Sequence, residues 1–153
     1  MLKSLIKNIR FGLATNSSSS HSLVYRSEPV SDMVMSDGSS YDTEYGWGHF
    51  VLDSLGEKLM YALTDLLGSQ HWWKEDVDPD EVDRLHSEYS HLFPELNKSH
   101  FEQALRGYID HESVGTADVK TARDPLVEIH GGNDNGDSGC SDCSDGDDDY
   151  WYR

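Results

Sequence analysis

The pattern of apolar and polar positions along the chain predicts three helices in its middle. After three separate opening signals, apolar residues recur every three or four positions, a period that places them on one helix face. The openings are a capping-box spacing at Ser54 and Glu57, the Asp78-Pro79 pair, and a second capping-box spacing at Ser99 and Glu102. Stop signals follow at Gly68, Pro94 and Gly107.

Short apolar runs toward both ends of the chain predict strands. They cover residues 23–25, 30–35, 49–52 and 125–130. Residues 2–10 carry apolar side chains at helical spacing, and extended structure is equally compatible with residues 9–13. Strands toward both ends with helices between them are typical of an α+β domain. We expect one small α+β domain over residues 1–132, followed by a flexible acidic tail over residues 133–153 that ends in aromatic residues.

The charge balance narrows the classes of function. The 153 residues include 12 Lys and Arg against 29 Asp and Glu, a formal net charge of −17. Phosphate contacts need clustered cations, so direct binding to nucleic acid is not expected. No apolar run approaches the roughly 18 residues that cross a bilayer, so no membrane segment is expected. The first ten residues interleave charges with apolar side chains, whereas a signal peptide places its charges before an apolar segment. We therefore expect a cytoplasmic protein.

A polar run near the amino end is the first candidate site. It consists of Asn16, Ser17, Ser18, Ser19, Ser20 and His21. In a tight bend, the hydroxyl and backbone N–H groups of such a run converge on an anion, and a histidine can move a proton near neutral pH. The alternative is a serine-rich loop whose hydroxyls cap local backbone, beside a surface histidine.

The same run resembles the start of a known family. Residues Thr15-Asn16-Ser17-Ser18-Ser19-Ser20-His21-Ser22, soon after Phe11, resemble the amino-terminal signature of a family of small uncharacterised proteins of bacteria and tailed phages. Residues 45–50, 107–111 and 131–135 are also similar to the phage members. The resemblance extends over most of the chain to about residue 136 and implies a phage or prophage origin. It implies no reaction.

A second group of candidates follows the third predicted helix and the last predicted strand. These are Asp110 and His111 after the helix, and His130, Asn133 and Asp134 around Gly131-Gly132, where the last strand is expected to end. Histidine and aspartate are ligands of zinc and other transition metals, and they also serve as acid–base groups in phosphoester or glycosyl transfer. Their spacing fits no named metal motif, so three unrelated loops, with Gly131-Gly132 as a simple turn, are the alternative.

These residues lead to the hypothesis of a small enzyme with one pocket. In this hypothesis the catalytic residues are His21, Asp110 and His111, and a divalent metal is held by His130 and Asp134. A small anionic, phosphate-containing substrate is bound by Asn16, Ser17, Ser18, Ser19, Ser20, Trp47 and Asn133. Trp47 is included because Gly46 and Gly48 let a backbone approach closely, and packing under a loop is its alternative. The hypothesis requires His21, His111 and His130 to converge.

The competing hypothesis is a non-enzymatic acidic protein that binds a basic surface of a host or phage protein. Opposite charges would steer that encounter and make it sensitive to salt. The role of the two cysteines has two alternatives. Cys140 and Cys143 form one C-x-x-C in the tail, which is either half of a zinc site or a pair of solvated thiols.

Overall fold

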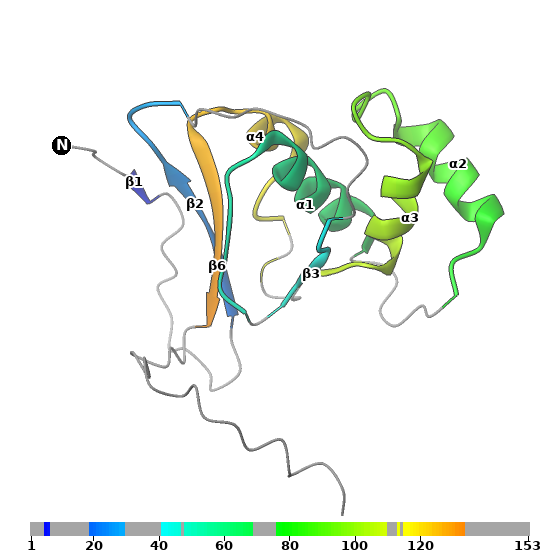
Figure 1. Cartoon of the computed structure of the whole chain (residues 1–153), viewed down its shortest axis with the longest axis horizontal. Coiled ribbons are helices and arrows are strands. Elements are labelled where there is room, and N and C mark those ends of the chain that lie inside the picture. Colours follow the sequence, from blue (N-terminus) through cyan, green and yellow to red (C-terminus); the bar gives the residue numbers. More distant parts are fainter. Residues whose placement is uncertain are drawn as a thin grey trace, which may run out of the picture.

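In the described part of the chain, four short strands come first, three helices follow, and two further strands flank a short fourth helix. The computed structural model describes residues 5–6, 19–29, 41–46, 48–68, 76–109, 113 and 115–133. The elements, in chain order, are β1 (Leu5–Ile6), β2 (Ser19–Tyr25), β3 (Glu44–Tyr45), β4 (Phe50–Leu52), α1 (Leu55–Gly68), α2 (Pro79–Tyr89), α3 (Lys98–Arg106), β5 (Tyr108–Ile109), α4 (Val119–Ala122) and β6 (Val127–Asn133). They form a single small α+β domain, as the apolar pattern predicts (Figure 1).

The main sheet has four antiparallel strands in the order β1-β2-β6-β4. β2 and β6 pair along their whole length, from Ser19 opposite Asn133 to Tyr25 opposite Val127. Paired residues share a face of a sheet and successive residues alternate between faces. Ile129 is therefore on the same face as the residues paired with it, and this face packs against α1.

Helix α1 is the centre of the molecule, between the sheet and the α2–α3 pair (Figure 1). It is buried on both sides: Tyr61 packs with Ile129 of the sheet, and Leu63 packs with Phe101 of α3. A second, parallel sheet joins β3 to β5 beside it. Gly107 permits that junction, because a Cβ at this position would be 2.8 Å from the carbonyl oxygen of Thr43. Among the described residues, no helix is both long and apolar enough to cross a membrane.

Two of the three predicted helix starts are confirmed. The Ser54 hydroxyl accepts a hydrogen bond from the Glu57 N–H at 3.3 Å, and the Asp78 side chain accepts one from the Asp80 N–H at 2.9 Å. The third predicted start is wrong by two residues. Asn97, not Ser99, caps α3, because the ring of His100 reaches back to the Asn97 N–H and completes a capping box there.

Three other local expectations differ from the structure. Leu5–Ile6 is a strand, because pairing with β2 outweighs the helical spacing of residues 2–10. The short helix α4 was not predicted. The last strand does not end at His130 in a glycine turn but continues to Asn133, the residue assigned to the tail. The remaining tail and the predicted strand at residues 30–35 lie outside the described residues.

Gly131 serves close packing rather than a turn. It lies in β6 opposite His21 of β2 and Phe50 of β4. A Cβ on Gly131 would lie 2.1 Å from a ring carbon of Phe50. The glycine therefore lets the Phe50 ring lie across the backbone of β6, beside His21.

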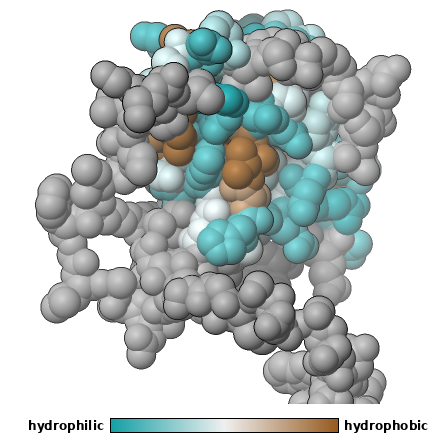
Figure 2. All heavy atoms as spheres, turned by 60° about the vertical axis from the view of Figure 1, so that its left-hand side comes forward, coloured by the Kyte–Doolittle hydropathy of each residue, from teal (hydrophilic) through white to brown (hydrophobic). Residues whose placement is uncertain are grey.

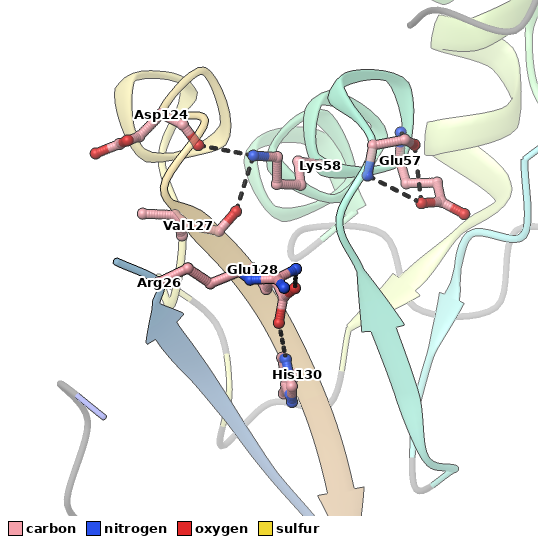
Figure 3. Close-up of polar contacts among 8 residues, drawn as sticks. Arg26, Glu57, Lys58, Asp124, Val127, Glu128 and His130 are labelled. Carbon is pink, nitrogen blue, oxygen red and sulfur yellow. Dashed lines mark hydrogen bonds and ion pairs between the residues drawn. The ribbon is translucent and has the colours of Figure 1, made fainter. Parts of the chain in front are cut away.

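A buried lysine fixes the corner between α4 and β6. The ammonium of Lys58 on α1 donates to the carbonyl oxygens of Asp124 and Val127, each at 2.8 Å (Figure 3). Lys58 is fully buried, and this burial lowers its pKa. The two carbonyl contacts are the reason a charged side chain is retained here, because they replace the lost hydration.

Candidate functional site

His21 is a core residue on the face of the sheet that packs against α1. Its side chain is 2% exposed. Its Nδ1 lies 2.6 Å from the Tyr61 hydroxyl, and its Nε2 lies 3.4 Å from the carbonyl oxygen of Gly46. A carbonyl only accepts hydrogen bonds, so the neutral ring carries its proton on Nε2 and accepts the Tyr61 O–H at Nδ1. The backbone N–H of His21 donates to the Ser113 hydroxyl at 3.2 Å.

Aromatic rings enclose this imidazole. Phe50 and Tyr61 meet it edge to face, with ring centroids at 5.0 and 5.7 Å, and Tyr45 meets Tyr61 at 4.8 Å. Burial raises the pKa of Tyr45, and nearby carboxylates add to the rise. Burial also raises the pKa of Tyr61, although a hydrogen bond with Thr116 opposes the rise. Both phenols are therefore neutral at physiological pH, and the buried imidazole of His21 is enclosed by these rings.

A different polar group lies on the opposite face of the sheet. Glu128 is central: one carboxylate oxygen accepts from the Arg26 guanidinium at 2.6 Å, and the other lies 2.8 Å from the Nε2 of His130 (Figure 3). Ser22 is the residue of β2 directly opposite His130. Burial raises the pKa of Glu128, but the hydrogen bond from His130 and the charge of Arg26 outweigh burial and hold that pKa below its usual range. Figure 2 brings the sheet side forward and shows an apolar patch among hydrophilic residues.

The structure does not bring His21 and His130 together. His21 pairs with Gly131, the residue after His130, so the two imidazoles are on opposite faces of the sheet. The sequence analysis expected one pocket shared by His21, His111 and His130. The structure describes His21 and His130, and these two do not share a pocket. The physical reason is the period of two along β6, which continues through the glycines where the sequence indicated a loop.

The other candidate residues fall into two groups. Ser19, Ser20 and Asn133 are in strands, where Ser19 pairs with Asn133, so this end of the serine run is extended and not a tight bend. The rest lie outside the described residues: Asn16, Ser17, Ser18, Trp47, Asp110, His111, Asp134, Cys140 and Cys143. Within the described ranges, no group of three or more His, Cys, Asp or Glu side chains is arranged to hold a metal ion.

Sequence reasoning missed Tyr61 and Glu128, the partners of the two histidines. The sequence did carry a signal for Glu128. Val127 and Ile129 are apolar while Glu128 and His130 are polar, and this period of two places Glu128 and His130 on one face of a strand. Tyr61 carried no such signal, because its contact with His21 crosses 40 residues of chain.

The described surface carries many more carboxylates than cations. Seventeen Asp and Glu and seven Lys and Arg lie in the described part. Five of those cations form ion pairs: Arg26 with Glu128, Arg84 with Glu88, Lys98 with Asp83, Arg106 with Glu102, and Arg123 with Glu95. Lys58 is buried on carbonyl groups, and Lys120 is the remaining one. Most described cations are thus already matched by a carboxylate or a carbonyl, and the excess negative charge stays on the surface.

Comparison of this chain with family models, with curated proteins and with solved structures finds no match. The resemblance of residues 15–22 to the bacterial and phage family therefore stays a prediction. The geometry of the chain itself carries the functional argument.

Proposed function

We propose that this protein is an acidic interaction protein of the cytoplasm that binds a basic surface of a host or phage protein. One observation carries the proposal: six of the seven described Lys and Arg side chains are ion-paired or buried, while carboxylates outnumber them on the same surface. Most of these cations are therefore already matched by a carboxylate or a carbonyl group, and the carboxylates in excess of them can meet a partner.

Electrostatics gives this surface a partner class. A net charge of −17 attracts clustered Lys and Arg from a distance, raises the rate of encounter and repels nucleic acid. Basic surfaces of this kind occur on proteins that bind nucleic-acid phosphates. Binding of this type weakens as salt rises, because the Debye length shortens to about 8 Å at physiological ionic strength.

The experiment is a competition. Labelled duplex DNA is bound to each of several purified basic DNA-binding proteins, and its fluorescence anisotropy is followed as this protein is added at about 50 mM salt and again at about 300 mM. We expect release of the DNA from at least one of them at low salt and a weaker effect at high salt. Retention of DNA by all of them at low salt would contradict the proposal.

A charge variant assigns the effect to the tail or to the folded part. The tail holds seven aspartates within residues 134–149. Changing all seven to asparagine in the full-length chain should reduce the competition only partly, since the described carboxylates are unchanged. Complete loss in this variant would make the tail the binding element.

A second candidate, a small enzyme acting on an anionic phosphate-containing substrate, is favoured by the group of Arg26, Glu128 and His130 on the face of the sheet opposite α1. In the neutral ring, the His130 Nε2 proton is held by Glu128, so Nδ1 is the basic nitrogen, and Arg26 supplies a positive charge beside it. Ser22 is opposite on the neighbouring strand. Turnover of nitrophenyl phosphate mono- and diesters, with and without Mg²⁺ or Zn²⁺, tests this candidate. His130→Asn should reduce the rate more than tenfold, and absence of turnover in every condition contradicts it.

A further inference from the structure

A groove between α2 and α3 is the feature that the site described above does not use. It has a volume of about 310 Å³ and lies between the amino-terminal turns of the two helices. Val77, Pro79 and Val82 give it an apolar lining. Volumes of ligand pockets begin at about 300 Å³, so this groove accommodates a side chain of a partner better than a large cofactor.

Aspartates occupy every second position along one edge of the groove. Asp76, Asp78 and Asp80 are exposed and alternate with the two lining residues Val77 and Pro79. Among the described residues, none of these three aspartates forms an ion pair. A segment that places one apolar side chain in the groove would therefore meet carboxylates immediately beside it.

The opposite wall of the groove comes from α3. Ser99 is exposed, and its hydroxyl accepts a hydrogen bond from Gln103 at 3.3 Å. Glu102 lines the groove and pairs with Arg106 at 3.0 Å. Lys98 is the cation of the lining, and Asp83 holds it at 2.7 Å, so it adds no net positive charge at the groove.

We infer that this groove is the docking site for one apolar side chain of a lysine- or arginine-rich segment on the basic partner. Charge complementarity selects that occupant over a second copy of this acidic chain, and the apolar lining selects a segment that is not purely cationic. The inference rests on the proposed function and deepens it by naming where the partner binds.

The probe is a pair of peptides: one leucine between two runs of lysine, and its twin with glycine at the centre. Burial of a leucine side chain in the groove is favourable, so we expect the full-length protein to prefer the leucine peptide by about tenfold at low salt. Calorimetric titration of both peptides gives this ratio.

Two matched pairs of variants locate the binding. Ser99→Trp fills the groove without changing charge, and Ser27→Trp places the same side chain on an exposed turn elsewhere. Glu102→Lys reverses a charge of the groove, and Glu28→Lys reverses one beside Ser27. We expect Ser99→Trp to abolish the leucine preference and Ser27→Trp to keep it, while Glu102→Lys weakens both peptides by a larger factor than Glu28→Lys does.

The outcomes separate the groove from the general proposal. Equal effects within each pair, or no leucine preference in the parent protein, would overturn the docking site and leave acidic binding intact. Failure of both peptides to bind at low salt would overturn the proposed function itself. Circular dichroism verifies that each variant is folded, and shifts of the Val77 and Val82 methyl resonances in the parent protein give a test that needs no variant.

Discussion

His21 and His130 are on neighbouring strands, one residue apart in register, and the two faces of the sheet give them different surroundings. His21 faces α1 and is 2% exposed, whereas the His130 side chain is 34% exposed and pairs with Glu128. The first ring is held by neutral phenol and aromatic contacts, and the second by charges. The comparison teaches that residue type alone did not fix the role of either histidine. The face of the sheet did.

The largest expected change in stability comes from truncating each histidine. His21→Ala leaves a cavity and removes the partner of the Tyr61 hydroxyl, so we expect a loss of about 3 kcal/mol in the free energy of unfolding. His130→Ala removes a partly exposed contact while Arg26 still pairs with Glu128, and should cost about 1 kcal/mol or less. Urea unfolding measures both, and equal losses would refute the assignment of the two faces.

The two glycines of β6 sharpen the same contrast. A methyl group on Gly131 meets the Phe50 ring on the α1 side, so Gly131→Ala should destabilise the fold by about 2 kcal/mol. A methyl group on Gly132 meets only the exposed His49 ring at 3.2 Å, which can move, so Gly132→Ala should stay within about 0.5 kcal/mol. Thermal unfolding compares them. A turn at this position would make the two substitutions similar.

Alkaline pH tests the buried phenols on the α1 side. Above about pH 10 the unfolded chain releases the protons of Tyr45 and Tyr61, whose pKa values burial raises in the folded protein. The unfolded state then binds fewer protons, so the free energy of unfolding falls by about 1.4 kcal/mol per pH unit for each tyrosine.

Two checks accompany that measurement. Lys58 acts in the opposite sense, because its pKa is lowered in the folded protein. Its contribution to the free energy of unfolding therefore rises with pH, but only up to the pKa of lysine in the unfolded chain, about 10.4. Tyr45→Phe removes one titrating group and should reduce the slope above that pH by about half. Phenolate absorbance that appears before unfolding would mean that the tyrosines are accessible to solvent.

The smallest expected effect belongs to Glu128, on the face of the sheet opposite α1, and appears at acidic pH. Because the pKa of Glu128 is lowered on folding, its contribution is fully present above the ordinary glutamate value of about 4.3 and is lost as pH falls through the folded value. We expect Glu128→Gln to cost about 1 kcal/mol at neutral pH and less at about pH 3. A difference that is the same at both pH values would contradict the ion-pair account.

Several features of the fold could be predicted because they are encoded locally. The starts of α1 and α2 follow from Ser54 with Glu57 and from Asp78 with Pro79, whose side chains bond to backbone only two or three residues away. The start of α3 was wrong because two capping residues, Asn97 and Ser99, compete within one turn, and the reach of His100 decides between them.

The candidate site was predictable only in part. His21 was singled out by its polar run, and His130 by its place at the end of a strand, but their separation onto opposite faces depends on a strand that continues through Gly131 and Gly132. A glycine pair reads as a turn in the sequence, and only the ring of Phe50 against Gly131 shows that the glycine is there for close packing.

By itself, the sequence determined the charge, the three longer helices and the α+β class, because net charge is a sum over residues and helix periodicity is a local property. The tertiary structure alone decided which histidine is enclosed, which cations are paired outside their own helix and where a groove opens. Each of these depends on contacts between residues far apart in the chain, such as His21 with Tyr61 and Lys98 with Asp83, and on which face of an element the register turns toward the core.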